Sequence, residues 1–112
     1  MIGVHLIIDG VLHHNVNEEV GRRILSELPA LIGMKVLAGP YVVEGVPENP
    51  GWTGFVIIDK SHIAIHTFYE GNTISVDVFS CKTFDEEVVI RYLEELLPFE
   101  KMNTRMLERT EE

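Results

Sequence analysis

The stretch of sequence that decides the fold is residues 61–80, SHIAIHTFYEGNTISVDVFS. Residues 61–69 and 73–80 are rich in β-branched and aromatic side chains. Such runs predict two strands, and Glu70-Gly71-Asn72 between them has the composition of a hairpin turn. The sequence therefore predicts an antiparallel β-hairpin in the middle of a sheet.

Outward from this hairpin, strand-like stretches and helix-like periodicity follow one another along the chain. Asn17 has the character of a helix N-cap, Pro29 is expected to kink or end the helix that follows, and Gly33 closes it. Pro98 is expected to stop a second helix. The expected strands are 2–8, 35–43, 52–58, 61–69, 73–80 and 99–107, and the expected helices are 17–33 and 84–97.

This order of elements in a chain of 112 residues predicts a single domain over 1–112. The fold class is α+β: a two-layer sandwich of one antiparallel sheet with two helices on one face. The other face of the sheet would then be uncovered. The central strands have too many apolar residues for both faces to be wet: Ile63, Ile65, Val76, Val78 and Phe79. We therefore expect two copies to stack their sheets in a dimer.

The composition excludes several classes of partner. The net charge is −9, and the nine Lys and Arg residues are scattered, which argues against nucleic acid. No stretch approaches the ~20 apolar residues that span a bilayer, so no membrane partner is expected. Asp9 interrupts the first apolar stretch, and no basic region precedes it, so we expect no secretory signal. Cys81 is the one cysteine, so a cytoplasmic protein without an internal disulfide is expected.

The hairpin brings a serine and the cysteine together. With Gly71-Asn72 as the centre of the turn, opposed residues have numbers that sum to about 142 or 143. Ser61 is then expected opposite Cys81 or Lys82. His66 lies five positions further along the strand, or roughly 16 Å at ~3.3 Å per residue. A histidine there reaches Ser61 only from a partner chain, which is a second reason to expect a dimer.

Each of these polar residues also has an ordinary explanation. A serine at a strand start is commonly a turn residue, and a lone cysteine is commonly a small buried hydrophobe. His62 and His66 share one face of a strand but lie ~13 Å apart, too far for one zinc ion. His13-His14 follows a strand end and has no third ligand, so exposed imidazoles are expected there. No metal site is expected.

The combination of motifs is more specific than any one residue. The segment 61–67, SHIAIHT, is followed at 76–81 by VDVFSC. Together with His5-Leu6 and Thr53-Gly54, these segments resemble the prokaryotic S-adenosylmethionine decarboxylase family. The resemblance covers most of the chain, and it implies a self-cleaving decarboxylase of spermidine biosynthesis. It also implies a homodimer of cleaved protomers with active sites at the interface.

By this resemblance, the Ser61 hydroxyl attacks the carbonyl of Lys60, and β-elimination cleaves the resulting ester. The dehydroalanine that remains hydrolyses to a pyruvoyl group, a built-in cofactor that forms a Schiff base with the substrate amine and accepts electrons during decarboxylation. The family roles make His66 the base of the elimination. Thr53 stands where the family has a hydroxyl near the ester.

The resemblance also implies roles on the substrate side. Cys81 would protonate the decarboxylated carbon, and Glu70 matches a glutamate that binds the substrate ribose. Ser61 and Cys81 would come from one chain, whereas Thr53, His66 and Glu70 would come from the other.

Three departures from the family pattern concern the substrate, and one of them is Phe68-Tyr69 where the family often has Trp-Pro. Lys60 stands where the family has a glutamate, and a lysine at a few ångströms repels a cationic substrate by ~1 kcal/mol in water. Pro47 stands where the family stacks an aromatic ring on adenine. Trp52, Phe68 and Tyr41 are the aromatic residues that would replace it.

Three functional hypotheses remain open at this point. The chain decarboxylates S-adenosylmethionine, or it decarboxylates another cationic amino acid such as arginine or ornithine, or it is an unprocessed, non-catalytic relative with the same fold. Carbon dioxide release over a panel of substrates separates the first two. A pyruvoyl carbonyl, detected by hydrazine labelling, excludes the third.

Overall fold

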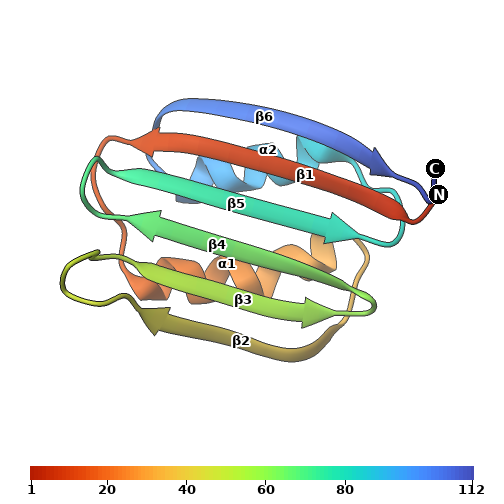
Figure 1. Cartoon of the computed structure of the whole chain (residues 1–112), viewed down its shortest axis with the longest axis horizontal. Helices are drawn as coiled ribbons and strands as arrows, with labels where there is room; N and C mark the ends of the chain where they lie inside the picture. The colour runs from red at the N-terminus through yellow and green to blue at the C-terminus, as the bar shows by residue number, and fades with distance from the viewer.

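Six strands form one antiparallel sheet in the order β2-β3-β4-β5-β1-β6 (Figure 1). The computed structural model describes all residues, Met1–Glu112. The strands are β1 Gly3–Leu12, β2 Val36–Glu44, β3 Trp52–Ile58, β4 Ser61–Phe68, β5 Thr73–Ser80 and β6 Phe99–Arg109, and the helices are α1 Glu18–Leu31 and α2 Glu86–Leu96. All eight expected elements are present, and most boundaries move by a few residues.

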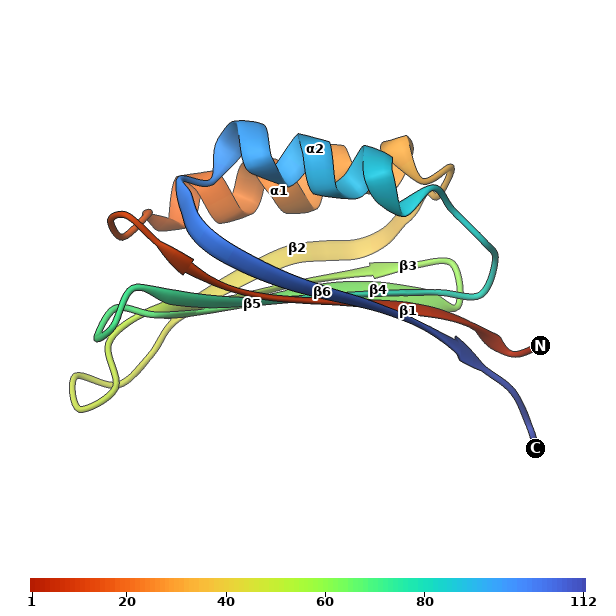
Figure 2. The ribbon, with the colours of Figure 1, turned by 90° about the horizontal axis from the view of Figure 1, so that it is seen from above.

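Both helices cover the same face of the sheet, and the opposite face, called the open face below, has no covering element (Figure 2). This arrangement confirms the predicted α+β two-layer sandwich. Helix α1 packs against β2, β3 and α2. Neither helix has the length and apolar character needed to cross a membrane.

Alternation along the strands builds the core between the sheet and the helices. On β4, Ser61, Ile63, Ile65 and Thr67 are buried while the residues between them are partly exposed. The buried residues of β5 alternate in the same way. Because successive strand side chains point to opposite faces, the buried set of both strands faces the helices.

Local sequence fixes where the helices begin. The Asn17 side chain accepts hydrogen bonds from the backbone N–H groups of Glu19 and Val20, which confirms the predicted N-cap of α1. Asp85 caps α2 by accepting from the Glu87 N–H at 3.0 Å. Pro29 lies buried in the last turn of α1, and the helix continues only to Leu31.

The prediction of an apolar open face is wrong for four of its five residues. Ile63, Ile65, Val76 and Val78 are fully buried beneath the helices, and only Phe79 points to the open face, where it contacts the rings of His5 and His62. The central strands are apolar because the helix layer covers one of their faces. The number of apolar residues on the central strands therefore does not support a dimer in which two sheets stack.

The hairpin register differs by one or two residues from the predicted sums of 142 or 143. His62 pairs with Phe79 and Phe68 pairs with Thr73, so opposed numbers sum to 141. Four residues, 69–72, form the turn, and its centre lies between Glu70 and Gly71, one residue before the predicted centre at Gly71-Asn72. Ser61 consequently lies level with Ser80, and Cys81 follows directly after the strand.

We expect the two faces of the sheet to differ in their tolerance of truncation. Val76→Ala empties part of the core and should lower the free energy of unfolding by about 2 kcal/mol, at roughly 0.8 kcal/mol per buried methyl-sized group plus a cavity term. Val43 lies on edge strand β2 and is 66% exposed, so Val43→Ala should change the free energy of unfolding by less than about 0.5 kcal/mol. Urea denaturation measures both, and equal losses would contradict this assignment of faces.

Candidate active site

Ser61 and Cys81 meet at the end of the sheet where β4 begins and β5 ends. The Cys81 backbone N–H donates to Ser61 Oγ at 2.9 Å, and Ser61 Oγ–H donates to the Asp59 carbonyl at 3.1 Å. The Cys81 thiol also donates to the Asp59 carbonyl oxygen, at 3.5 Å. The predicted proximity of serine and cysteine is therefore present, although the register behind it is shifted by one or two residues.

The residue before the serine has an unusual backbone. Asp59 and Lys60 form the short loop between β3 and β4, and Lys60 has φ +54°. A non-glycine residue in this left-handed region carries strain on the order of 1 kcal/mol or more. The peptide bond between Lys60 and Ser61 thus starts from a strained conformation.

His66 and Thr53 form a second polar pair at the opposite end of the strands. They are opposite one another on β4 and β3, and Thr53 Oγ1 and His66 Nδ1 lie 3.0 Å apart. In the tautomer that donates Nδ1–H to Thr53, Nε2 keeps a free lone pair and is able to accept a proton. Ser61 is buried on the helix side whereas His66 is partly exposed on the open face, so one chain does not bring these two residues together.

A shallow groove of about 400 Å³ lies beside the Lys60–Ser61 peptide on the open side of the sheet. Phe55 and His62 contribute to its wall, and Arg109 closes one side. Its lining residues include two permanent cations, Lys60 and Arg109, and no carboxylate. The residues that line this groove therefore offer no counter-charge to a cationic ligand.

A second hollow of about 450 Å³ lies at the His66 end of the open face, between β1, β5 and β6. Phe68 contributes to its wall and is 39% exposed, so its ring is accessible to a ligand. Glu70 is exposed in the adjoining turn. Tyr41 is also exposed, on edge strand β2.

Trp52 does not fit its predicted place among the substrate-binding residues. It is 1% exposed, its indole N–H donates to the Val16 carbonyl at 2.9 Å, and its ring packs against Gly21 of α1. A Cβ at Gly21 would lie 2.5 Å from the ring, so the absence of a side chain there makes room for the indole. Trp52 is a core residue, because the first position of β3 faces the helices.

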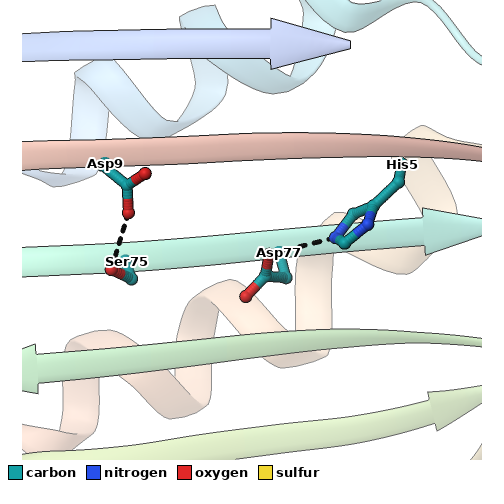
Figure 3. A network of polar contacts seen from close by, with 4 residues as sticks. All are labelled: His5, Asp9, Ser75 and Asp77. Carbon is teal, nitrogen blue, oxygen red and sulfur yellow. Dashed lines mark hydrogen bonds and ion pairs between the residues drawn. The ribbon is translucent and has the colours of Figure 1, made fainter. Parts of the chain in front are cut away.

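The middle of the open face carries a row of polar contacts between β1 and β5 (Figure 3). His5 Nε2 lies 3.0 Å from Asp77 Oδ1, and Ser75 Oγ donates to Asp9 Oδ1 at 2.7 Å. Beside them, the His62 ring stacks on Phe55 with centroids 5.8 Å apart and meets Phe79 on its other side at 5.7 Å. The open face is thus a mixed surface of aromatic rings and paired polar groups.

Burial between two aromatic rings lowers the pKa of His62 below its usual 6.5, and His5 and Arg109 lower the pKa further while Asp77 opposes them. The unfolded chain therefore binds a proton more readily, so the free energy of unfolding should rise with pH up to about 6.5 and fall below it. Urea denaturation between about pH 5.5 and 7.5 measures this slope. His62→Gln should flatten it, and an unchanged slope would contradict the assignment.

The sequence predictions missed two residues beside Ser61 and Cys81, namely Asp59 and Ser80. The Asp59 carbonyl accepts hydrogen bonds from both Ser61 and Cys81. The two-residue polar loop between the strands was the feature of the sequence that could have indicated this contact. Ser80 is fully buried. The alternation of Ile74, Val76 and Val78 along the strand could have predicted that the next residue in the series, Ser80, also faces the core.

Comparisons with known proteins agree in one family. The sequence model of the S-adenosylmethionine decarboxylase family matches residues 5–110. S-adenosylmethionine decarboxylase proenzymes of Clostridium botulinum are similar to this chain: that of the Loch Maree strain is 42% identical over 103 residues, covering 88% of this chain and 86% of the relative. That of the Langeland strain is 35% identical over 107 residues, covering 92% and 90%.

A crystal structure of the adenosylmethionine decarboxylase from Aquifex aeolicus has the same fold. The TM-score is 0.72 at 22% sequence identity, and the match covers 99% of this chain and 95% of that one. At this identity the match speaks for the fold alone.

Proposed function

The chain belongs to the S-adenosylmethionine decarboxylase family, and we propose that it is a pyruvoyl-dependent enzyme that cuts itself between Lys60 and Ser61. It then decarboxylates S-adenosylmethionine for spermidine biosynthesis. The observation that carries the proposal is the convergence of the Ser61 hydroxyl and the Cys81 thiol on the Asp59 carbonyl, beside a strained peptide bond. We also propose that it works in the cytoplasm, where a single free cysteine stays reduced.

Self-cleavage begins at the Ser61 hydroxyl. Its oxygen bonds to the carbonyl carbon of Lys60, the C–N bond breaks, and the hydroxyl proton ends on the Ser61 nitrogen. The Cys81 N–H, which donates to Oγ, restrains the oxygen in one position for this attack. The left-handed conformation of Lys60 is released when the bond breaks, which favours the ester.

The second step needs a base that removes the Cα proton of Ser61. The Cβ–O bond then breaks, and Lys60 leaves with a carboxylate as the end of the first fragment. Water adds to the dehydroalanine, ammonia departs, and a ketone remains. His66 is the base, and Thr53 holds its Nδ1 at 3.0 Å so that Nε2 takes the proton.

His66 has to come from a partner subunit, because it lies five positions from Ser61 along β4, or roughly 16 Å at ~3.3 Å per residue. We propose a dimer in which two sheets stack on their open faces. A two-fold axis that runs across the strands reverses their direction, so the His66 end of one copy covers the Ser61 end of the other. The two hollows of the open face then close into one site.

The residues at Ser61 fit a pyruvoyl group, since the residue that would become the group lines the groove and the Cys81 thiol shares a hydrogen-bond acceptor with it. The group supplies the electron sink for decarboxylation. The thiol then delivers a proton to the decarboxylated carbon. No metal takes part in this scheme.

Substrate charge is balanced from the second subunit. The groove beside Ser61 holds Lys60 and Arg109 and no carboxylate, so the counter-charge for a cationic substrate is Glu70 of the partner subunit. Phe68 of the partner subunit offers an aromatic face to the adenine ring of the substrate. This division explains how a chain with Lys60 next to the serine accepts a cation.

Two measurements test the proposed function. Intact-mass analysis should find a 60-residue fragment that ends at Lys60 and a second fragment with the remaining 52 of the 112 residues. Carbon dioxide release is then measured with S-adenosylmethionine, arginine and ornithine as substrates. A chain that stays whole and releases no carbon dioxide contradicts the proposal, and release from arginine or ornithine alone contradicts the substrate.

A further inference from the structure

Ser80 is a polar residue in an apolar place. It is the last residue of β5 and is 0% exposed, and it continues the core-facing series that Ile74, Val76 and Val78 begin. A hydroxyl buried among aliphatic side chains destabilises the fold unless it is hydrogen-bonded. An alanine or valine would complete the series without this requirement, so the hydroxyl calls for a local explanation.

The Ser80 hydroxyl closes a tight turn on itself. Its Oγ–H donates to the Lys82 carbonyl at 2.6 Å, and its Oγ accepts from the Lys82 N–H at 3.1 Å. One side chain thus satisfies both backbone groups of Lys82 and bends the chain immediately after the strand. Because the bend spans three residues, it fixes the orientation of the peptide between Ser80 and Cys81.

This bend aims Cys81 at Ser61. The Cys81 N–H leaves the ladder of β5 and donates to Ser61 Oγ at 2.9 Å, and its thiol turns to the Asp59 carbonyl at 3.5 Å. Without the bend, residue 81 would continue the strand direction and lose both contacts. The buried hydroxyl is therefore linked to Ser61 through the backbone of Lys82 and Cys81, by hydrogen bonds at both ends of this segment.

Neighbouring elements support the bend from two sides. On β1, Gly3 lies directly against the Ser80 carbonyl. A Cβ at this position would lie only 3.2 Å from the Cys81 Cα, so a side chain at Gly3 would collide with the turn. On the other side, Lys82 Nζ donates to the Gly33 carbonyl after α1 at 3.2 Å. The turn is thus anchored to both layers of the fold.

We propose that Ser80 is a positioning residue, which by bending residues 80–82 sets the Ser61 hydroxyl and the Cys81 thiol for self-cleavage and protonation. The effect on self-cleavage rests on the proposed function. The positioning of Cys81 by the bend rests only on the hydrogen bonds of residues 80–82. Ser80 touches neither the scissile carbonyl nor the substrate, and acts only through Lys82 and Cys81.

The first experiment measures the rate of cleavage of freshly made chain by intact mass. Ser80→Ala should slow cleavage at least tenfold. Val76→Ala is the matched control, because it lies on the core face of the same strand and destabilises the fold without touching the turn. It should cleave within about threefold of the unmodified chain when its melting temperature is lowered as much as that of Ser80→Ala.

A second pair of variants isolates the hydroxyl. Ser80→Thr and Ser80→Val have nearly the same shape, and only the threonine keeps the hydrogen-bonding group. The threonine variant should cleave at least tenfold faster than the valine variant. Equal rates in this pair, or a loss in Val76→Ala as large as in Ser80→Ala, would overturn the proposal.

Hydrogen exchange of the Cys81 amide separates this inference from the proposed function. Ser80→Ala should speed its exchange at least tenfold, while the amide of Val78 exchanges at an unchanged rate. If the unmodified chain does not cleave but this difference is present, the proposed function fails and the positioning role holds. An unchanged Cys81 rate overturns the positioning role, whether or not the chain cleaves.

Discussion

Ser61→Ala should leave every chain whole at 112 residues and should reduce carbon dioxide release to the level without enzyme. In the proposed mechanism no ester forms at Lys60 without the hydroxyl, so no pyruvoyl group arises to accept the electrons of decarboxylation. Intact-mass analysis reports the first effect, and release of carbon dioxide from carboxyl-labelled S-adenosylmethionine reports the second. Both losses should be complete rather than partial.

The loss in Ser61→Ala should not come from unfolding. Ser61 Oγ makes two hydrogen bonds, to Asp59 and Cys81, at the end of the sheet, and each is worth about 1 kcal/mol. A thermal melt checks that the variant stays folded. Ser26→Ala, at an exposed position of α1, makes the same chemical change elsewhere and should cleave normally. Cleavage of Ser61→Ala at the same bond would refute the assignment of the nucleophile.

Co-expression of Ser61→Ala with His66→Ala should restore cleavage, although neither variant should cleave alone. In a mixed dimer, the His66→Ala chain keeps its serine and receives His66 of the partner subunit, so one of the two sites is complete. Random pairing makes about half of the dimers mixed, so about a quarter of all chains should be cut. Every cut chain should carry the alanine at position 66.

Intact mass distinguishes the two chains, and size-exclusion chromatography establishes that they form dimers. The matched control pairs His66→Ala with the double variant that lacks both residues, since this mixture contains no His66 and should stay whole. Mixed dimers of the first pair that remain uncut would show that the base does not come from the partner. Cleavage by His66→Ala alone would show that another group is the base.

Much of the fold was predictable because its determinants are close together in the sequence. The Asn17 cap, the alternation along β4 and β5, and the apolar series of the helices each involve residues within a few positions of one another. The predicted bounds of β3 and β5 match the structure, and the fold class follows from the order of the elements.

The site was predictable in its members more than in its geometry. Ser61 and Cys81 lie together as expected, and His66 lies out of reach of Ser61 in one chain, as strand spacing requires. The expected pairing was wrong by one or two residues, because the turn uses four residues with its centre between Glu70 and Gly71. Sequence composition does not fix that centre, since the dihedral angles of the loop decide it.

The sequence by itself determined which segments are strands and helices, that Ser61 lies near Cys81, and that His66 lies out of reach of Ser61 within one chain. The tertiary structure alone decided which face each residue occupies: Trp52 lies under α1, Ser80 lies in the core, and Phe68 lies on the open face. The physical reason is the distance along the sequence over which the determining interactions act. Backbone periodicity and capping depend on near neighbours, whereas facing and register depend on where the helix layer settles and how each loop turns.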